Sequence, residues 1–254
     1  MTSLAALLLC ALAGGDKVEL RFAPVEGSQV RRTIAIDQTL AAKGSEPLTT
    51  RKFLRTLDQY RKLGDGRPLV LQRRFEQIGG SSAGVSPLQG TSVVYTWVPE
   101  EAAYGKYYDA LESSEAALRD LAEDLDLRAL LPRGAVATGE SWSVPAAQLR
   151  DVLAPLGFLG VTDYLGELQG ECKLALAAVG ERQGRSIATV ELALKIQNAT
   201  WTFEGRGTLD WDLGARRAAS FALSGDQTQH FEPQAAPLAG TLAYTWKFED
   251  PGSK

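Results

Sequence analysis

The stretch 126-DLRALLPRGAVATGESWSVP-145 divides the chain into two sets of predicted strands. Pro132 and Gly134 are expected to end a helix that comes before them, because proline lacks an amide donor and glycine favours helix ends. Pro145 suits the first position of a second, short helix. Trp142 is the largest apolar side chain between these two helices, so we expect it to anchor the connection in the core.

Apolar and polar residues alternate through most of the remaining chain, as in antiparallel strands with one face in water. Before the stretch, the alternation covers residues 18–22, 30–40, 49–63, 69–75, 93–97 and 104–108. After it, the alternation covers residues 168–176, 190–196, 201–211, 219–223 and 242–248. Residues 49–63 also fit one face of a helix, but the Gly64-Asp65-Gly66 turn that follows favours a hairpin. Residues 242–248 fit either a final strand or a loosely held arm.

Four residues interrupt this alternation. Arg32 and Gln38 fall on the apolar face of an early strand, which predicts that part of this face lies at a rim. Gly205 and Gly207 interrupt a later strand, and they predict a bend or a bulge there.

Two helices are predicted in the middle of the chain. The first is capped by Ser113 or Ser114 and carries leucines at helical spacing, with the acidic run 123–126 on its wet side. The second runs from Pro145 to about Leu153. The expected fold is therefore α+β and mostly antiparallel β, with a long curved, half-barrel-like sheet and two central helices.

Length and charge limit the class of protein. The chain has 254 residues, with 27 Lys and Arg and 31 Asp and Glu, for a net charge of -4. It lacks the basic excess that neutralises phosphates along a nucleic acid, so nucleic-acid binding is not expected. No segment after the N-terminus is apolar enough to predict a membrane helix.

The N-terminal residues 1–13, MTSLAALLLCALA, are predicted to be a signal peptide. They are apolar, too short to span a bilayer, and end in the small residues that signal peptidase prefers, although no Lys or Arg precedes them. The alternative is a buried N-terminal element. Export to the periplasm or cell envelope of a bacterium is therefore expected. Residues 14–254 are predicted to form a single β-rich domain, with an N-terminal half to about 130 and a C-terminal half from about 140.

The same interpretation predicts the state of each of the two cysteines. Cys10 would leave with the signal peptide, and Leu9 before it does not match the small residue expected ahead of a lipidated cysteine. Cys172 would remain alone, without a partner for an internal disulfide. It falls at an alternate apolar position, which predicts a buried and unreactive thiol.

A hydrolytic site is not expected from the motifs. Residues 80–84, GSSAG, match G-x-S-x-G, which needs a strand before it and a helix after it, but Pro87 and Gly90 and then a predicted strand follow it here. His230 is the only histidine in the chain and is expected at a surface or rim. We therefore predict no catalytic residue, no metal ligand set and no cofactor, and rank a hydrolase using Ser82 or His230 third among the possible functions.

Other polar motifs also have simple interpretations. Asp210 and Asp212 share one side of a strand and are expected to form a solvated face rather than a cation site. The sequon Asn198-Ala199-Thr200 matters only where glycosylation machinery exists. The run Gly205-Arg206-Gly207 lacks the third glycine and the strand-to-helix context of a dinucleotide site.

The central stretch resembles a family of uncharacterised secreted bacterial proteins. The resemblance rests on its D-L-R-A-L-L-P start with the later Gly, Ser-Trp and Val, on V-Y-T-W at residues 94–97, and on G-x-G-T-L-x-W-D-L at residues 205–213. It covers most of the chain after Val18 and implies no known activity. In architecture alone, the strand-rich pattern with central helices is similar to periplasmic lipoprotein-carrier half-barrels.

The aromatic residues offer the remaining functional candidates. Core filling is their usual role. The alternative is the lining of an apolar cavity inside the curved sheet, formed by the large apolar residues Trp97, Leu192, Leu194, Ile196, Trp201 and Phe203. The first hypothesis is therefore a non-catalytic envelope protein that holds a lipid or lipoprotein acyl chain. The second is a structural or protein-interaction module of the envelope with a filled core.

Overall fold

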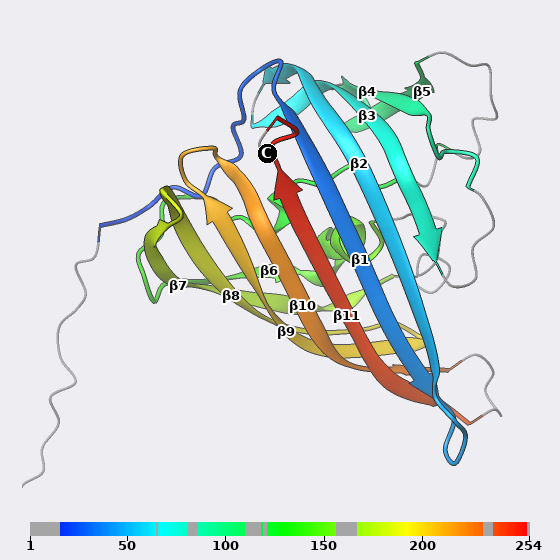
Figure 1. Cartoon of the computed structure of the whole chain (residues 1–254). Helices are drawn as coiled ribbons and strands as arrows, with labels where there is room; N and C mark the ends of the chain where they lie inside the picture. Colours follow the sequence, from blue (N-terminus) through cyan, green and yellow to red (C-terminus); the bar gives the residue numbers. More distant parts are fainter. Residues whose placement is uncertain are drawn as a thin grey trace, which may run out of the picture.

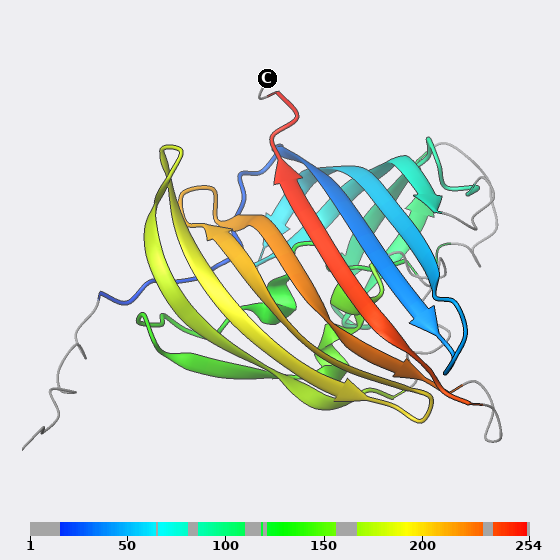
Figure 2. The same ribbon diagram turned by 60° about the horizontal axis from the view of Figure 1, so that its bottom comes forward.

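The computed structural model describes residues 16–64, 66–80, 86–109, 118, 121–155, 167–230 and 236–252. These residues form one 11-stranded antiparallel sheet, which curves around the central part of the chain as Figures 1 and 2 show. The predicted mostly antiparallel, half-barrel-like sheet is confirmed.

The strands are longer than the average for globular proteins. They are β1 (Gln29–Ala41), β2 (Leu48–Gly64), β3 (Arg67–Gly80), β4 (Ser92–Val98), β5 (Ala103–Tyr108), β6 (Ser141–Pro145), β7 (Gln169–Arg182), β8 (Arg185–Gln197), β9 (Trp201–Asp212), β10 (Arg217–Gln229) and β11 (Leu238–Glu249). The short helices are the 3₁₀ helices η1 (Arg128–Leu130) and η2 (Ala146–Leu149) and the single-turn α2 (Arg150–Leu153).

The order of strands in the sheet is β5-β4-β3-β2-β1-β11-β10-β9-β8-β7-β6. Each strand pairs with its neighbour in sequence except β5 with β6, while β11 returns to pair with β1. The C-terminal strand therefore lies between β1 and β10 and joins the two halves (Figure 1). Of the two alternatives for residues 242–248, the strand is the one found.

The expectation of two central helices is wrong for the residues described. Besides the helical residue Leu118, they contain one short α-helix, α2, which follows η2. Pro145 is the cap residue before η2, in an extended conformation. The predicted cap of the first helix at Ser113 or Ser114 lies outside the described residues. Residues 121–125 are not helical. The amides of Glu123 and Asp124 donate to Asp151 Oδ2 at 2.8 and 2.7 Å, and the carbonyls of Leu121 and Ala122 accept from side chains of the sheet.

The predicted N-terminal strand is reduced to one bridge. Val18 and Val136 exchange two backbone hydrogen bonds of 2.9 Å each, outside the sheet. Leu20 and Phe22 are nevertheless buried, so the alternation correctly marked their inward side chains. The segment is held against the central stretch rather than against another strand.

The core lies on the concave face of the sheet. Alternate residues of the strands are buried in one cluster with residues of the central stretch. Figure 2 shows that this central part of the chain lies within the curve of the sheet. Among the described residues, the largest fully buried side chains include Trp201, Trp211 and Trp246. Trp142 is only partly buried, on the edge strand β6, and its Nε1 donates a 3.0 Å hydrogen bond to the carbonyl of Leu130.

The two glycines of β9 mark a close approach between strands. The register of β9 with β10 runs without interruption through Gly205 and Gly207. A Cβ atom on Gly207 would lie 2.1 Å from the carbonyl oxygen of Ala222 on β10, so a larger residue would push the strands apart. The shift in register that typifies a bulge lies instead between Ala218 and Ser220.

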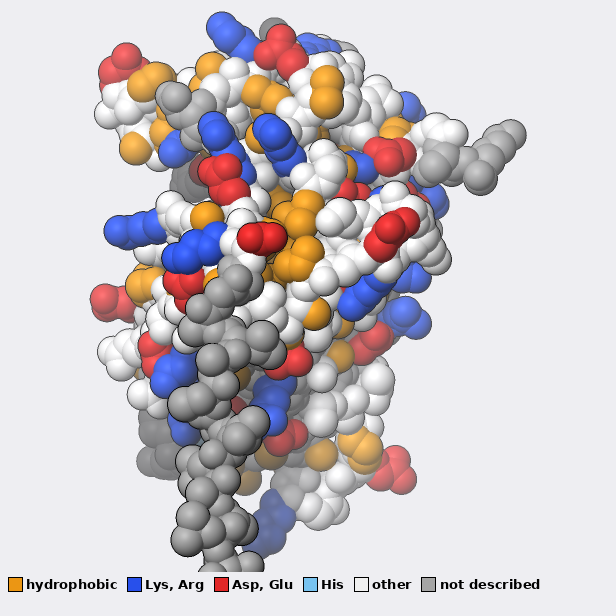
Figure 3. Space-filling model, turned by 90° about the vertical axis from the view of Figure 1, so that its left-hand side faces the viewer, with side chains coloured by type: hydrophobic (Ala, Val, Ile, Leu, Met, Phe, Trp, Pro, Cys, Tyr) orange, Lys and Arg blue, Asp and Glu red, His pale blue; other side chains and the backbone are white. Residues whose placement is uncertain are grey.

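The outer surface is mixed in charge. Figure 3 shows Lys and Arg side chains interspersed with Asp and Glu and with small hydrophobic patches. Within the described part of the chain, no helix has the length and apolar character needed to cross a membrane.

Candidate ligand-binding site on the concave face

The predicted cavity residues of β8 and β9 come together on the concave face. Ile196 lies directly opposite Phe203 in the register of the two strands. The rings of Trp201 and Phe203 stack with centroids 5.7 Å apart and planes 4° apart. With Leu192 and Leu194, these side chains form a continuous apolar surface, and each is at most 5% exposed.

Trp97 is not part of this surface. It lies on β4, six strands from β9 in the sheet order. It is also near the opposite end of the strands from Trp201. Its ring packs edge to face against Tyr104, with ring centroids 5.1 Å apart. The guanidinium of Arg67 lies over the Trp97 ring, 4.0 Å from the ring centroid. Five of the six predicted residues therefore cluster on β8 and β9, and Trp97 lies apart from them.

Side-chain amides, two of them buried, border the cluster beside Trp201. Trp201 Nε1 donates to Gln227 Oε1 at 3.1 Å, and Gln229 and Gln38 donate to the same oxygen at 3.2 Å. The Gln227 amide nitrogen donates to the carbonyl of Thr241 at 3.0 Å. The apolar surface thus ends in polar groups that already have partners.

The concave face is covered by the segment that contains η2 and α2. Leu149, Val152 and Leu153 are buried against the core. The hydroxyl of Tyr244, from β11, donates a 2.9 Å hydrogen bond to the carbonyl of Leu153. Burial raises the pKa of Tyr244 above its ordinary value, so the hydroxyl stays protonated and keeps donating. This bond ties the short helical cover to the middle of the sheet.

A buried ionic network lies under the other half of the sheet. Arg32 of β1, Asp58 of β2 and Arg73 of β3 are each at most 1% exposed. Arg73 Nη2 lies 3.0 Å from Asp58 Oδ2, and Arg32 Nη1 lies 2.5 Å from the same oxygen. The contact of Arg32 with Asp58 is not aligned as a hydrogen bond, so it is a purely ionic contact. The prediction that Arg32 marks a rim is wrong, because these charges neutralise one another inside the core.

The central stretch completes this network. Asp126 accepts hydrogen bonds from the Arg32 guanidinium and, at 2.5 Å, from the Tyr60 hydroxyl. Arg73 Nη1 donates to the carbonyl of Ala122 at 2.7 Å. The acidic run 123–126 is therefore not the wet side of a helix, since Asp126 is 3% exposed and pairs with a buried arginine.

The pKa values in this network follow from burial and charge. Burial alone would raise the pKa of Asp58, but the charges of Arg32 and Arg73 and the hydrogen bonds from Arg73 outweigh it and hold the pKa below its ordinary value. Burial raises the pKa of Tyr95, which stacks near Arg73, to about 12. Asp58 is thus charged near neutral pH, between the two arginines.

Sequence reasoning missed this network because its members are distant in the chain. Each looks like an ordinary polar residue of a strand face or of an acidic run. The one available signal was Arg32, a charge at an inward position of a strand.

The residues considered for hydrolysis do not come together. Ser82 lies outside the described residues. His230 is exposed, just after the end of β10. Cys172 is buried on β7, as predicted, and burial with the nearby Glu171 raises its pKa to about 12. The described residues therefore place no nucleophile beside a base.

The paired aspartates have structural partners. Asp210 accepts from Thr189 at 2.9 Å and faces Arg182 at 3.1 Å. Asp212 is 6% exposed and accepts from the amide of Ala215 in the turn that follows, so the expected solvated face is wrong for Asp212. Within the described chain, no group of acidic residues, His or Cys is arranged to hold a metal ion.

The sequon asparagine also has a structural role. Asn198 Oδ1 accepts hydrogen bonds from the backbone amides of Thr200 at 2.9 Å and Trp201 at 2.7 Å. These bonds shape the turn between β8 and β9.

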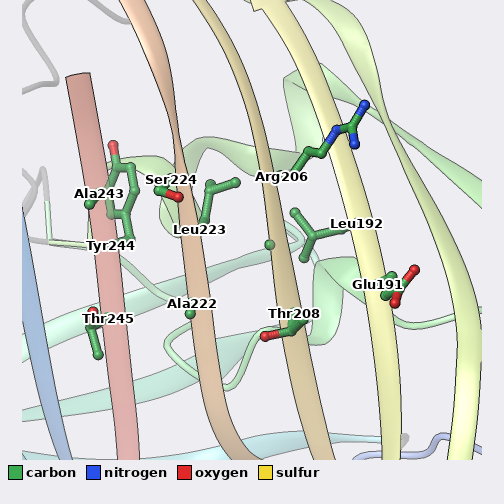
Figure 4. A pocket seen from close by; sticks show the side chains of 11 residues that line it. Glu191, Leu192, Arg206, Thr208, Ala222, Leu223, Ser224, Ala243, Tyr244 and Thr245 are labelled. Atoms are coloured by element: carbon green, nitrogen blue, oxygen red, sulfur yellow. The ribbon is translucent and has the colours of Figure 1, made fainter. Parts of the chain in front are cut away.

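A pocket of about 600 Å³ lies across the outer side of four strands, β8 to β11, as Figure 4 shows. Its exposed side chains are mostly small, such as Ala222 and Ser224, with Arg206 and Glu191 at one side. Leu192 and Leu223 belong to its lining but are buried in the core. This surface is therefore distinct from the predicted cavity.

No protein-family model matches the chain, and no curated protein matches it. Two solved structures are similar in architecture. The first is a LolA superfamily protein, NE2245, from Nitrosomonas europaea, at 10% identity and a TM-score of 0.20, over 91% of this chain and 87% of the other. The second is DynF from the dynemicin biosynthesis pathway of Micromonospora chersina, at 10% identity and a TM-score of 0.24, over 93% and 85%. Both likenesses are weak.

Proposed function

We propose that the protein is a non-catalytic binding protein that holds an apolar chain, such as a lipid or a lipoprotein acyl chain, against the concave face of its sheet. The observation that carries this proposal is the continuous apolar surface of Leu192, Leu194, Ile196, Trp201 and Phe203. Apolar sites bordered by a few polar groups are typical of lipid and small-molecule binding.

The cover over this face supports the proposal. Its described part consists of one 3₁₀ turn and one α-helical turn, which carry few backbone hydrogen bonds of their own. One hydrogen bond, from Tyr244 to Leu153, ties it to the sheet in this region. If the cover moves away, Leu149 and Val152 lose their contacts with the sheet. An apolar ligand in their place would bury the same apolar surface of the sheet.

The test is binding by the purified protein. We expect native mass spectrometry of protein prepared without detergent to reveal an adduct that organic extraction identifies as a lipid. We also expect a fluorescent fatty acid to bind. Leu194→Arg should abolish both, whereas Ala193→Arg, the next residue on the opposite and exposed face of β8, should leave them unchanged.

Circular dichroism would check that both variants remain folded, and Phe203→Leu offers a milder variant that should weaken binding while keeping an apolar core. Folded wild-type protein that carries no lipid and takes up none of the probe would contradict the proposal.

One observation favours a second function, a structural or protein-interaction module of the cell envelope. The side chains of the candidate site are 0–5% exposed, so the concave face is filled by the chain itself. This function predicts lipid-free protein and specific protein partners that cross-link to it in envelope preparations.

We further propose that the protein is exported, on the basis of residues 1–13 and their cleavage pattern. N-terminal sequencing of the protein from a bacterial envelope fraction should begin at Gly14. A chain that starts at Met1 and remains in the cytoplasm would contradict export.

A further inference from the structure

A second pocket lies at the opposite end of the strands from Trp201. It has a volume of about 380 Å³ and is formed where residues 19–22 meet the β2–β3 turn at Gly66 and the loop 128–134. This is the end at which β1 begins and β11 finishes, since Arg31 pairs with Glu249 there. The pocket is therefore separate from the apolar surface of β8 and β9.

Three arginines surround this pocket. Arg21, Arg128 and Arg133 line it, and Glu19 is the single acidic residue among its described lining. Arg21 and Arg133 are exposed, and neither forms an ion pair with a described carboxylate. Such a local excess of positive charge is notable in a chain with a net charge of -4.

Arg128 is fixed in place at the inner side of the pocket. Its Nε lies 3.0 Å from Asp124 Oδ1, and its guanidinium carbon lies 5.7 Å from the centroid of the Phe22 ring. Its side chain is 20% exposed. Arg128 is thus held by Asp124, by the Tyr104 hydroxyl and by an aromatic ring, and a guanidinium fixed in this way is preorganised to present its remaining donors.

The floor of the pocket is apolar. Leu20 and Phe22 are each 3% exposed and belong to the core, and Leu131 and Pro132 are partly buried beside them. Arginine presents its donors in a planar fork that matches the oxygens of a phosphate group. A pocket with arginine walls and an apolar floor suits a phosphate group attached to an organic body rather than a bare ion.

We propose that this pocket binds a phosphate ester, with Arg128 as the fixed contact and Arg21 and Arg133 as the outer contacts. The site stands whether or not the concave face binds a lipid. The phosphate belongs either to a soluble ester or to a lipid headgroup, and both offer the same oxygens to the arginines.

The experiment uses two probes on the full chain. Glycerol 3-phosphate is titrated calorimetrically at low ionic strength, and vesicles of phosphatidylcholine with phosphatidic acid are tested by flotation against phosphatidylcholine alone. Binding of glycerol 3-phosphate identifies a soluble ester as a ligand. Flotation that needs phosphatidic acid, without calorimetric binding, identifies the lipid headgroup.

Arg21→Gln and Arg133→Gln should each weaken the observed binding about tenfold, the loss expected for one charge-assisted hydrogen bond. Because both side chains are exposed, these variants should fold normally. Arg206→Gln, which removes the same charge from the outer face of β9, should leave binding unchanged. Failure of folded wild-type protein to bind either probe, or binding that is the same in all three variants, would overturn the proposal.

Discussion

Arg73 faces Asp58 with three contacts, since its Nε lies 3.1 Å from each carboxylate oxygen and its Nη2 lies 3.0 Å from Oδ2. Both side chains are at most 1% exposed. Arg32 approaches the same carboxylate from β1, so Asp58 contacts both arginines, and Asp126 pairs with Arg32 as the second carboxylate. This arrangement makes Asp58 the residue on which the network depends most.

Asp58→Asn should strongly destabilise the protein. The substitution keeps the shape of the side chain but leaves two buried guanidinium groups with too little negative charge. Removal of one partner from a buried pair costs about 3–5 kcal/mol, which chemical denaturation should detect as a lower free energy of unfolding. Asp37→Asn is the matched control, because its ion pair with Arg51 is exposed and should contribute less than about 1 kcal/mol. Equal effects of the two variants would contradict this account.

Stability should also fall in acid because of Asp58. Its pKa in the folded protein is below the ordinary value, so its contribution is fully present above the pKa of the unfolded chain, near 4, and is lost as the pH falls through the folded pKa. Glu76, whose pKa is lowered by a hydrogen bond from Arg31, acts in the same direction. Denaturation midpoints measured between about pH 7 and 3 should drop in the wild type. They should drop less in Asp58→Asn, and an equal drop would show that the network is not responsible.

The buried ionic network shows which part of the structure the sequence pattern predicts and which part it does not. Alternation along the chain predicted β1 to β5 and β7 to β11, because each long strand has one buried and one wet face. It also placed Leu194 and Phe203 on a common face. Alternation says nothing about contacts between distant segments, so it did not predict that Asp126 would meet Arg32. Nor did it predict that the acidic run would form a loop that carries the buried Asp126.

The cysteine prediction leads to a chemical test. In a Cys10→Ser background, the Cys172 thiol should react with a thiol reagent about a thousandfold more slowly in the native protein than in denaturant. The reason is its pKa of about 12, which leaves very little thiolate at pH 8. Rates followed by absorbance would check this. Rapid native labelling would mean that the thiol is accessible.

Trp142 should contribute less to stability than a fully buried tryptophan. The side chain is partly buried on an edge strand, and its one polar bond reaches the carbonyl of Leu130. Trp142→Ala should therefore cost about 2 kcal/mol, below the 3–5 kcal/mol of a core position. Trp142→Phe, which removes mainly the hydrogen bond, should cost about 1 kcal/mol. If urea unfolding showed almost no loss in the free energy of unfolding for Trp142→Ala, Trp142 would not be an anchor.

Tyr244→Phe should loosen the cover on the concave face. The substitution removes the hydroxyl that bonds to Leu153 and leaves that buried carbonyl without its partner. Amide hydrogen exchange in the α2 region should become about tenfold faster, while exchange in β1 and β2 should be unchanged. Uniform acceleration across the sheet would indicate global destabilisation instead.

The position of β11 has a consequence for biosynthesis. A ribosome completes β1 to β5 early, and these strands can pair as each emerges, because their neighbours in the sheet are also their neighbours in the chain. The strands β6 to β10 can form a second sheet in the same way. Neither sheet can join the other until Leu238–Glu249 has been made, since this segment is hydrogen-bonded to β1 on one side and to β10 on the other. A chain that ends before Leu238 would therefore hold two unjoined sheets, each with an open edge at which chaperones or other chains would bind.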